Sequence, residues 1–212
     1  MAIKPILFNT EMVRAILDGR KDATRRIVKG FIPDDAVWGY TAFTPKGYIS
    51  CRGTFADGYG EKFFKLPCEP GDILYVRETF IQAAAHIFWY KADDKPWMSK
   101  GLRWKPSIHM PKEAARIWLK VTDVRVERLQ EITSEQISRE GVEVEYPHVL
   151  NGEEKRYAFS ALWNSTIKKS DLDRYGWDAN PYVWVISFER CAKPVESPYA
   201  WNDAIHKLTK GV

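Results

Sequence analysis

Cysteine is scarce in this sequence of 212 residues, which contains only three. Cys51, Cys68 and Cys191 lie far apart, and none belongs to the CxxC spacing of a zinc knuckle. An odd number of scattered cysteines argues against a disulfide framework and is typical of proteins from a reducing compartment. We therefore expect a cytoplasmic protein that is not held together by disulfides.

Long apolar runs are also missing. No segment of the sequence approaches the roughly 18 consecutive apolar residues that a helix needs to span a bilayer. The apolar run at the N-terminus is too short for a signal peptide. The sequence therefore predicts a soluble protein with no membrane partner.

The common signatures of cofactor and metal sites are absent as well. The sequence has no GxxxxGK(S/T), GxGxxG, HExxH or GxSxG motif. Its four histidines are scattered without the spacing of metal ligands, at positions 86, 109, 148 and 206. We expect neither a metal site nor a cofactor.

The excess of positive charge is small over the whole chain, at +4, but it is concentrated. The segment from Arg14 to Lys29 holds six basic and two acidic side chains, a local balance equal to that of the whole chain. Such a concentration suits a site for an anion or for a phosphate backbone. A solvated basic turn explains it about equally well, because charge runs usually face water.

Short strands outnumber helices in the pattern of apolar residues. The segment 116–129 alternates, with a phase slip near Thr122 that predicts a β-bulge in a strongly curved sheet. From about 31 to 67, turn signals at 44–47 and 56–58 predict hairpins. Further strands are expected at 5–8, 73–78, 86–91 and 182–188.

Few segments have the helical period. One helix is expected after Thr10, a suitable N-cap residue. Another begins at a capping box formed by Thr133 and Gln136 and ends at Gly141, and a third is expected over 157–167. Many strands with few helices favour an α+β domain in which a small curved or closed sheet carries helices at its ends.

Lys21 and Thr24 are candidates for nucleophilic catalysis. A threonine hydroxyl needs a neighbouring base, and a lysine serves as that base only if its pKa is lowered. The nearby arginines would lower this pKa by like-charge repulsion. From the residues alone, an exposed cation and an ordinary β-forming threonine remain the simpler interpretation.

Two carboxylates are further candidates. Glu140 lies three residues after Ile137 on the capped helix, near its core-facing side, where it should border a cavity or pair with a cation. Glu78 shares a strand face with Leu74 and Val76 and is expected to point inward. Without a catalytic task, Glu140 would be a rim residue and Glu78 an ion-pair partner of the clustered arginines.

Four blocks of the sequence resemble the ASCH domain superfamily. They are GRKDATRR from Gly19 to Arg26, PGDILYVRE from Pro70 to Glu78, the strand through Leu119–Val121, and VWVISF from Val183 to Phe188. Their order and spacing are most similar to the longer ASCH proteins of phages and prophages. The resemblance covers scattered blocks from about residue 3 to residue 190.

The resemblance implies a PUA-like fold, a curved β-barrel that has a cleft, flanking helices and an inserted β-hairpin region. Residues 1–192 would form one such domain, with insertions at about 31–67 and 91–107. Residues 193–212 would be a C-terminal tail.

The superfamily is associated with RNA binding and nucleoside chemistry, and its short bacterial members include N4-acetylcytidine amidohydrolases. Their catalytic lysine, threonine and glutamate, carried over by position, fall on Lys21, Thr24 and Glu140. The resemblance thus implies an enzyme that removes an acyl group from an N4-acylated cytidine or a related modified nucleoside. Thr24 would attack the acyl carbon, and backbone N–H groups after Gly19 would stabilise the oxyanion. Substrate binding would fall to Arg20, Arg25, Arg26 and Glu78.

Two other functions fit the same residues. A non-catalytic RNA or modified-base binding module would use the basic segment for phosphates and an aromatic residue, Trp38 or Trp104, for stacking. A phage accessory protein would instead bind another protein through its tryptophan-containing insertion.

Overall fold

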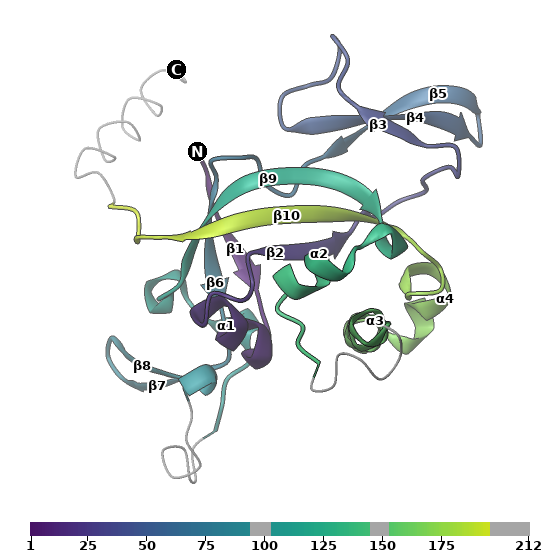
Figure 1. The fold of residues 1–212 in the computed structure, drawn as a ribbon. Helices are drawn as coiled ribbons and strands as arrows, with labels where there is room; N and C mark the ends of the chain where they lie inside the picture. Colours follow the sequence, from purple (N-terminus) through teal and green to yellow (C-terminus); the bar gives the residue numbers. More distant parts are fainter. Residues whose placement is uncertain (94–102, 145–152, 196–212) are drawn as a thin grey trace, which may run out of the picture.

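The computed structural model describes residues 1–93, 103–144 and 153–195, and its centre is a mixed five-stranded sheet (Figure 1). Strands β1 and β6 run parallel, and all other neighbours in the sheet are antiparallel. The protein is therefore an α+β protein with few helices. In sheet order the strands are β1 (Ile3–Leu7), β6 (Ile73–Arg77), β9 (Trp118–Arg128), β10 (Tyr182–Cys191) and β2 (Ala23–Ile27).

The sheet is open rather than closed into a barrel. Within the described residues, the edge strands β1 and β2 share no backbone ladder. After β1 ends at Leu7, the N–H of Phe8 donates to the backbone oxygen of Arg77 at 3.2 Å, and the chain then enters helix α1 (Thr10–Leu17). A side chain makes the connection, because Arg26 Nη2 of β2 donates a hydrogen bond to the backbone oxygen of Leu7 at 3.0 Å.

A β-bulge bends the longest strand, as predicted. Ser187 of β10 pairs with Asp123, but Phe188 pairs with Val121, which leaves Thr122 as the extra residue. The bulge brings Val121 and Val124 into the same buried cluster, although they are an odd number of positions apart. The two long strands arch over the helices as a result (Figure 1).

Helices α2 (Ser134–Arg139) and α3 (Glu154–Thr166) cover one face of the sheet, whereas Val13 and Ile16 of α1 pack in the cluster on the other face. Side chains of β10 alternate, so that Val183 and Val185 pack against α2 and α3, while Trp184 faces the other cluster. The short helix α4 (Leu172–Tyr175) follows α3. Single 3-10 turns complete the described chain at Lys91–Asp93, Ser107–His109, Lys112–Ala114, Leu129–Glu131 and Lys169–Asp171.

Local signals placed the helix ends with two errors, one of which is the start of α3, expected at 157 and found at Glu154. The N-cap of α1 is Asn9, whose side chain accepts a hydrogen bond from the backbone N–H of Met12, and not Thr10 as expected. Both residue types can cap a helix, and here the first helical residue is Thr10. The capping box of Thr133 and Gln136 at the start of α2 is confirmed.

Residues between β2 and β6 build a separate small sheet from β3 (Val37–Gly39), β4 (Tyr48–Phe55) and β5 (Gly58–Lys65). The hairpin turn expected at 56–58 is confirmed, since it joins β4 to β5. Trp38 packs on Phe64 within this sheet and attaches it to the end of the main one by edge contacts with the rings of Tyr182 and Trp184 of β10. Trp38 is half-buried among these rings, and its stacking on a base remains a prediction.

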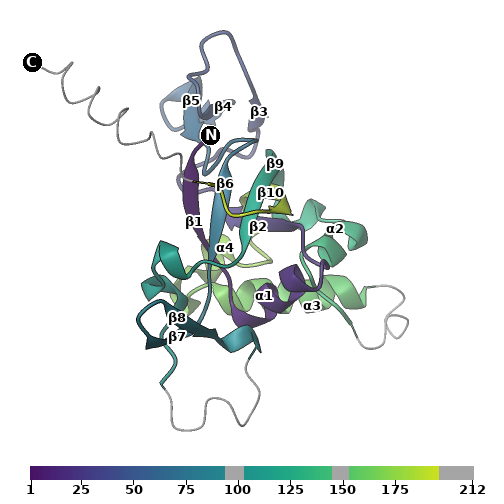
Figure 2. The ribbon, with the colours of Figure 1, turned by 90° about the vertical axis from the view of Figure 1, so that its left-hand side faces the viewer.

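A second hairpin lies at the other end of the molecule. Figure 2 shows this hairpin, β7 (Phe80–Ala84) and β8 (Ile87–Tyr90), at the opposite end from the β3–β5 sheet. Residues 94–102 of the expected insertion at 91–107, and 196–212 of the expected tail, lie outside the described residues. In the part of the chain that is described, no helix has the length and apolarity needed to cross a bilayer.

Candidate functional site

A pocket of about 80 Å³ lies beside the open edge of the sheet, between β2, the start of α1, the end of α2 and one face of α3. This volume holds a few water molecules. The predicted catalytic residues Lys21, Thr24 and Glu140 all line it, although 119 positions separate the first from the last. The other lining residues are Phe8, Asn9, Met12, Arg25, Arg26, Phe159, Leu162, Trp163 and Thr166.

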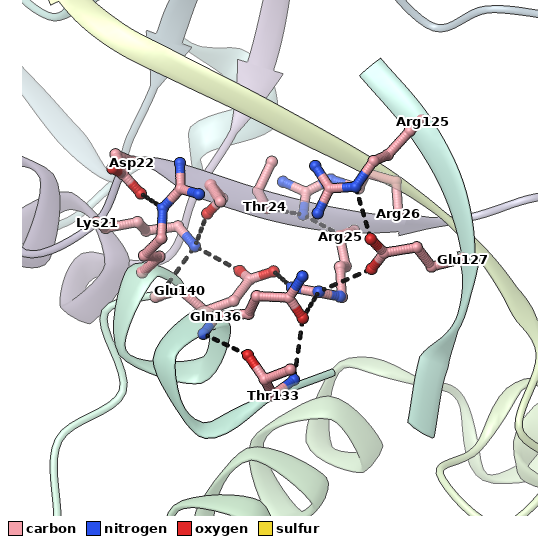
Figure 3. A network of polar contacts seen from close by, with 12 residues as sticks. Lys21, Asp22, Thr24, Arg25, Arg26, Arg125, Glu127, Thr133, Gln136 and Glu140 are labelled. Carbon is pink, nitrogen blue, oxygen red and sulfur yellow. Dashed lines mark hydrogen bonds and ion pairs between the residues drawn. The ribbon is translucent and has the colours of Figure 1, made fainter. Parts of the chain in front are cut away.

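Lys21 uses all its hydrogen-bonding capacity inside the protein. Its Nζ lies 2.7 Å from Oε2 of Glu140, 2.7 Å from the backbone oxygen of Ala23 and 2.9 Å from that of Glu140 (Figure 3). An ammonium group has three donors, so each has a partner. Burial lowers the pKa of Lys21 because desolvation disfavours the charged form, and the Glu140 carboxylate partly opposes this shift.

The backbone holds Lys21 against the end of α2. Lys21 and Glu140 form an isolated β-bridge, and the N–H of Asp22 donates to the backbone oxygen of Arg139 at 3.0 Å. Gly141, the residue after the helix, makes this approach possible. Its φ is +82°, and a Cβ atom there would lie 2.6 Å from Cβ of Ala15 and 3.1 Å from Cβ of Lys21.

Thr24 has a cationic neighbour. Its Oγ1 accepts a hydrogen bond of 2.7 Å from Nη1 of Arg26, whose guanidinium lies 5.3 Å from the centre of the Phe8 ring. Within the described structure no hydrogen bond joins Thr24 directly to Lys21, although both face the pocket. A guanidinium at this distance stabilises negative charge on the threonine oxygen.

Arg25 ties the pocket to the rest of the sheet. Its Nη1 donates to Oε1 of Glu140 at 3.1 Å, and its Nη2 donates to Oε1 of Gln136 at 3.1 Å and to Oε2 of Glu127 at 3.2 Å (Figure 3). The side chain is 1% exposed. Its buried Nε has no hydrogen-bond partner within the described residues, which leaves this donor unused.

The other two predicted binding residues lie away from the pocket lining. Arg20 pairs with Asp18 at 2.8 Å and with Glu143 at 3.4 Å. Glu78 points inward as expected, but its partner is Arg116, at 2.9 Å, and not one of the clustered arginines. Burial raises the pKa of Glu78, against the opposing effect of Arg116.

Ion pairs neutralise much of the basic segment. Arg14 pairs with Glu11, and the pairs of Arg20, Lys21 and Arg25 are those described above. Lys21 and Arg25 are also buried, so neither offers its charge to a phosphate at the surface. Two of these basic side chains thus pair in the interior, Lys21 and Arg25, and two pair at the surface, Arg14 and Arg20. An RNA-binding role for the basic segment remains a prediction.

Several residues of the site were not predicted. The pocket wall from α3 was foreseen only as an apolar helix face, and Gln136 only as a capping residue. Glu127 had no local signal, because it reaches Arg25 across strand β10 and 102 positions of sequence. Among the described residues there is no cluster of three or more His, Cys, Asp or Glu side chains that could hold a metal ion.

Comparisons of the chain with protein-family models, with curated proteins and with solved structures found no match.

Proposed function

We propose that the protein is an ASCH-type amidohydrolase with a PUA-like fold, which removes an acyl group from an N4-acylated cytidine or a related modified nucleoside. The supporting observation is the convergence of Lys21, Thr24 and Glu140 at one buried pocket. Separate elements supply them: Thr24 lies on β2, Lys21 just before it, and Glu140 at the end of α2. Aromatic and aliphatic side chains of α3 also line the pocket, as in sites that bind planar groups. A volume of about 80 Å³ is smaller than that of a typical ligand site, so the pocket must widen to admit a base.

The reaction starts with proton transfer from Thr24 to the uncharged form of Lys21. The Thr24 oxygen then forms a bond to the acyl carbon, and the carbonyl oxygen becomes an oxyanion. Collapse of this intermediate breaks the bond between the acyl carbon and the amino nitrogen of the base, which takes the proton from Lys21 as it leaves. Water then hydrolyses the acyl ester on Thr24, with Lys21 again acting as the base.

Arg26 is the group placed to stabilise the negative charge. The backbone N–H groups of Arg20 and Lys21, which were expected to do so, both donate to the backbone oxygen of Ala15. Arg26 lies beside the attacking oxygen of Thr24 and can donate to an oxyanion that forms next to it. Glu140 keeps Lys21 in place throughout, through both its carboxylate and its backbone oxygen.

The test is hydrolysis of N4-acetyl-, N4-propionyl- and N4-benzoylcytidine, followed by chromatography of the released cytidine. We expect the parent protein to release cytidine and Thr24→Val, which lacks the hydroxyl, to lose about 10³-fold or more of the rate. Thr24→Ser should retain measurable activity because it keeps the nucleophile. Lys29→Ala, which removes an exposed charge of the same segment outside the pocket, is the matched control. Absence of cytidine release by the parent protein with all three compounds would overturn the proposal.

A further inference from the structure

A line of alternating charges runs from the pocket to the surface. It leads from Lys21 to Glu140, then to Arg25, Glu127 and Arg125, with nitrogen–oxygen distances of 2.7, 3.1, 3.2 and 2.6 Å (Figure 3). The first three side chains are nearly inaccessible to solvent, and Glu127 is 19% exposed. Because water screens these charges poorly, a change at one of them is felt by the next.

Arg25 occupies the middle of this line and fixes the orientation of Glu140. The two carboxylate oxygens of Glu140 are divided between two cations, with Oε2 on Lys21 and Oε1 on Arg25. A carboxylate held at both oxygens cannot rotate away from Lys21. Gln136 adds a second link from Arg25 to the same helix, through its side-chain oxygen.

We propose that Arg25 is a positioning residue of the hydrolytic reaction: it holds the Glu140 carboxylate in place and adds a positive charge that helps Lys21 to release its proton. This inference rests on the proposed function. A basic residue that lines a pocket usually suggests ligand binding. Here, however, both terminal nitrogens of Arg25 are bonded to protein groups.

The charges around Lys21 determine the direction of the effect. Glu140 at the end of α2 favours the ammonium form, whereas Arg25 and Arg26 on β2 disfavour it. The residues of α1 and α3 that line the pocket are uncharged, and Asp22 turns instead to Arg139, at 2.7 Å. Removal of the charge of Arg25 therefore leaves Lys21 under a stronger net influence of Glu140, and Lys21 should hold its proton more tightly.

The experiment measures kcat/KM against pH for the parent protein, Arg25→Gln and Arg25→Lys. The activity rises with pH as Lys21 loses its proton. We expect the midpoint of this rise to move upward by about one pH unit in Arg25→Gln. Arg25→Lys, which keeps the charge, should restore most of the parent midpoint, and Lys29→Gln, at an exposed position of the same segment, should not move it. A lower rate with an unchanged midpoint in Arg25→Gln would mean a structural role only and would overturn the proposal.

A second variant tests the direction of the midpoint shift independently, and it replaces Arg25→Gln if that variant does not fold. Glu127→Gln removes a negative charge from the far side of Arg25, so the positive charge of Arg25 acts on Lys21 with less compensation. The midpoint should then move to lower pH, opposite to the shift in Arg25→Gln. An unchanged or raised midpoint in Glu127→Gln would contradict the inference.

A measurement without substrate separates this inference from the proposed function. The titration of Lys21 can be followed by NMR of its 13Cε and 15Nζ nuclei in the full-length protein. If the parent protein hydrolyses none of the acylated cytidines, the proposed function fails. An upward shift of the Lys21 titration in Arg25→Gln still supports the electrostatic role of Arg25, and an unchanged titration overturns it.

Discussion

Replacement of Gly141 by alanine tests whether the close approach of α2 to Lys21 is essential for the fold. Two costs add at this position. A residue with a side chain at φ +82° is strained by about 1 kcal/mol. The new methyl carbon would also lie 2.6 Å from Cβ of Ala15, and such overpacking costs about 1–3 kcal/mol. We therefore expect Gly141→Ala to lower the free energy of unfolding by about 2–4 kcal/mol.

Gly19 provides a matched control, because its φ is +75° and no atom lies within 4 Å of a Cβ built there. Gly19→Ala should therefore cost only the backbone strain, about 1 kcal/mol. Ala15→Gly, added to Gly141→Ala, removes the nearest obstructing atom and should recover part of the loss. This recovery will be reduced by the cost of about 1 kcal/mol for glycine within a helix.

Urea denaturation followed by circular dichroism measures all of these variants. A loss of 2–4 kcal/mol corresponds to a midpoint lower by roughly 1–2 M urea for a protein of this size. If Gly141→Ala and Gly19→Ala are equally stable within about 0.5 kcal/mol, the steric argument is wrong. In that case α2 can move away from Lys21 at little cost.

Three further predictions follow from capping, burial and charge. Thr133→Ala removes the N-cap of α2 and should destabilise the protein by about 1 kcal/mol in the same denaturation assay. Cys51 and Cys68 are buried, and burial raises the pKa of each thiol to about 11. Burial raises the pKa of Cys191 as well, but this thiol is only partly buried. A disulfide reagent at pH 8 should therefore label Cys191 faster than the other two in the folded protein, and equal rates would contradict their burial. Because burial lowers the pKa of Lys21 below 10.5, the unfolded chain holds this proton to higher pH. Stability should rise with pH between the folded pKa and 10.5, and Lys21→Met should remove that contribution from urea titrations at pH 8 and 10.

Local features of the fold were predictable because their causes are local. The capping box at Thr133 and the turn at 56–58 depend on residues close together in sequence, and the bulge at Thr122 shows in the sequence as a local slip of the alternating pattern. The parallel pairing of β1 with β6 spans about 70 residues and leaves no local pattern. The open edge lies between β1 and β2, which share no ladder in the described chain. An alternating pattern predicts a strand but not its neighbours, so closure was expected where none is found.

The candidate site was predictable only in part, because some of its residues are close together in the sequence and others are not. Lys21 and Thr24 are neighbours in sequence, and the resemblance supplied Glu140. The partners of Arg25 could not be foreseen, since Glu127 lies on a strand that is not adjacent to β2. Arg20 and Arg25 belong to the same basic segment of the sequence. Arg20 lies before β2 and pairs with Asp18 near the surface, whereas Arg25 lies on β2 and pairs with Glu140 in the interior.

Helix α2 has six residues, too few for a stable helix by itself. Contacts at both of its ends involve the charged pocket, since Gln136 accepts from Arg25 and Glu140 accepts from Lys21. Opening of this helix and loss of the lysine–glutamate pair are therefore one cooperative event. Amide hydrogen exchange in α2 should report on the assembly of the pocket, and molecules that lack the assembled pocket should also be the ones that a protease cuts at this helix.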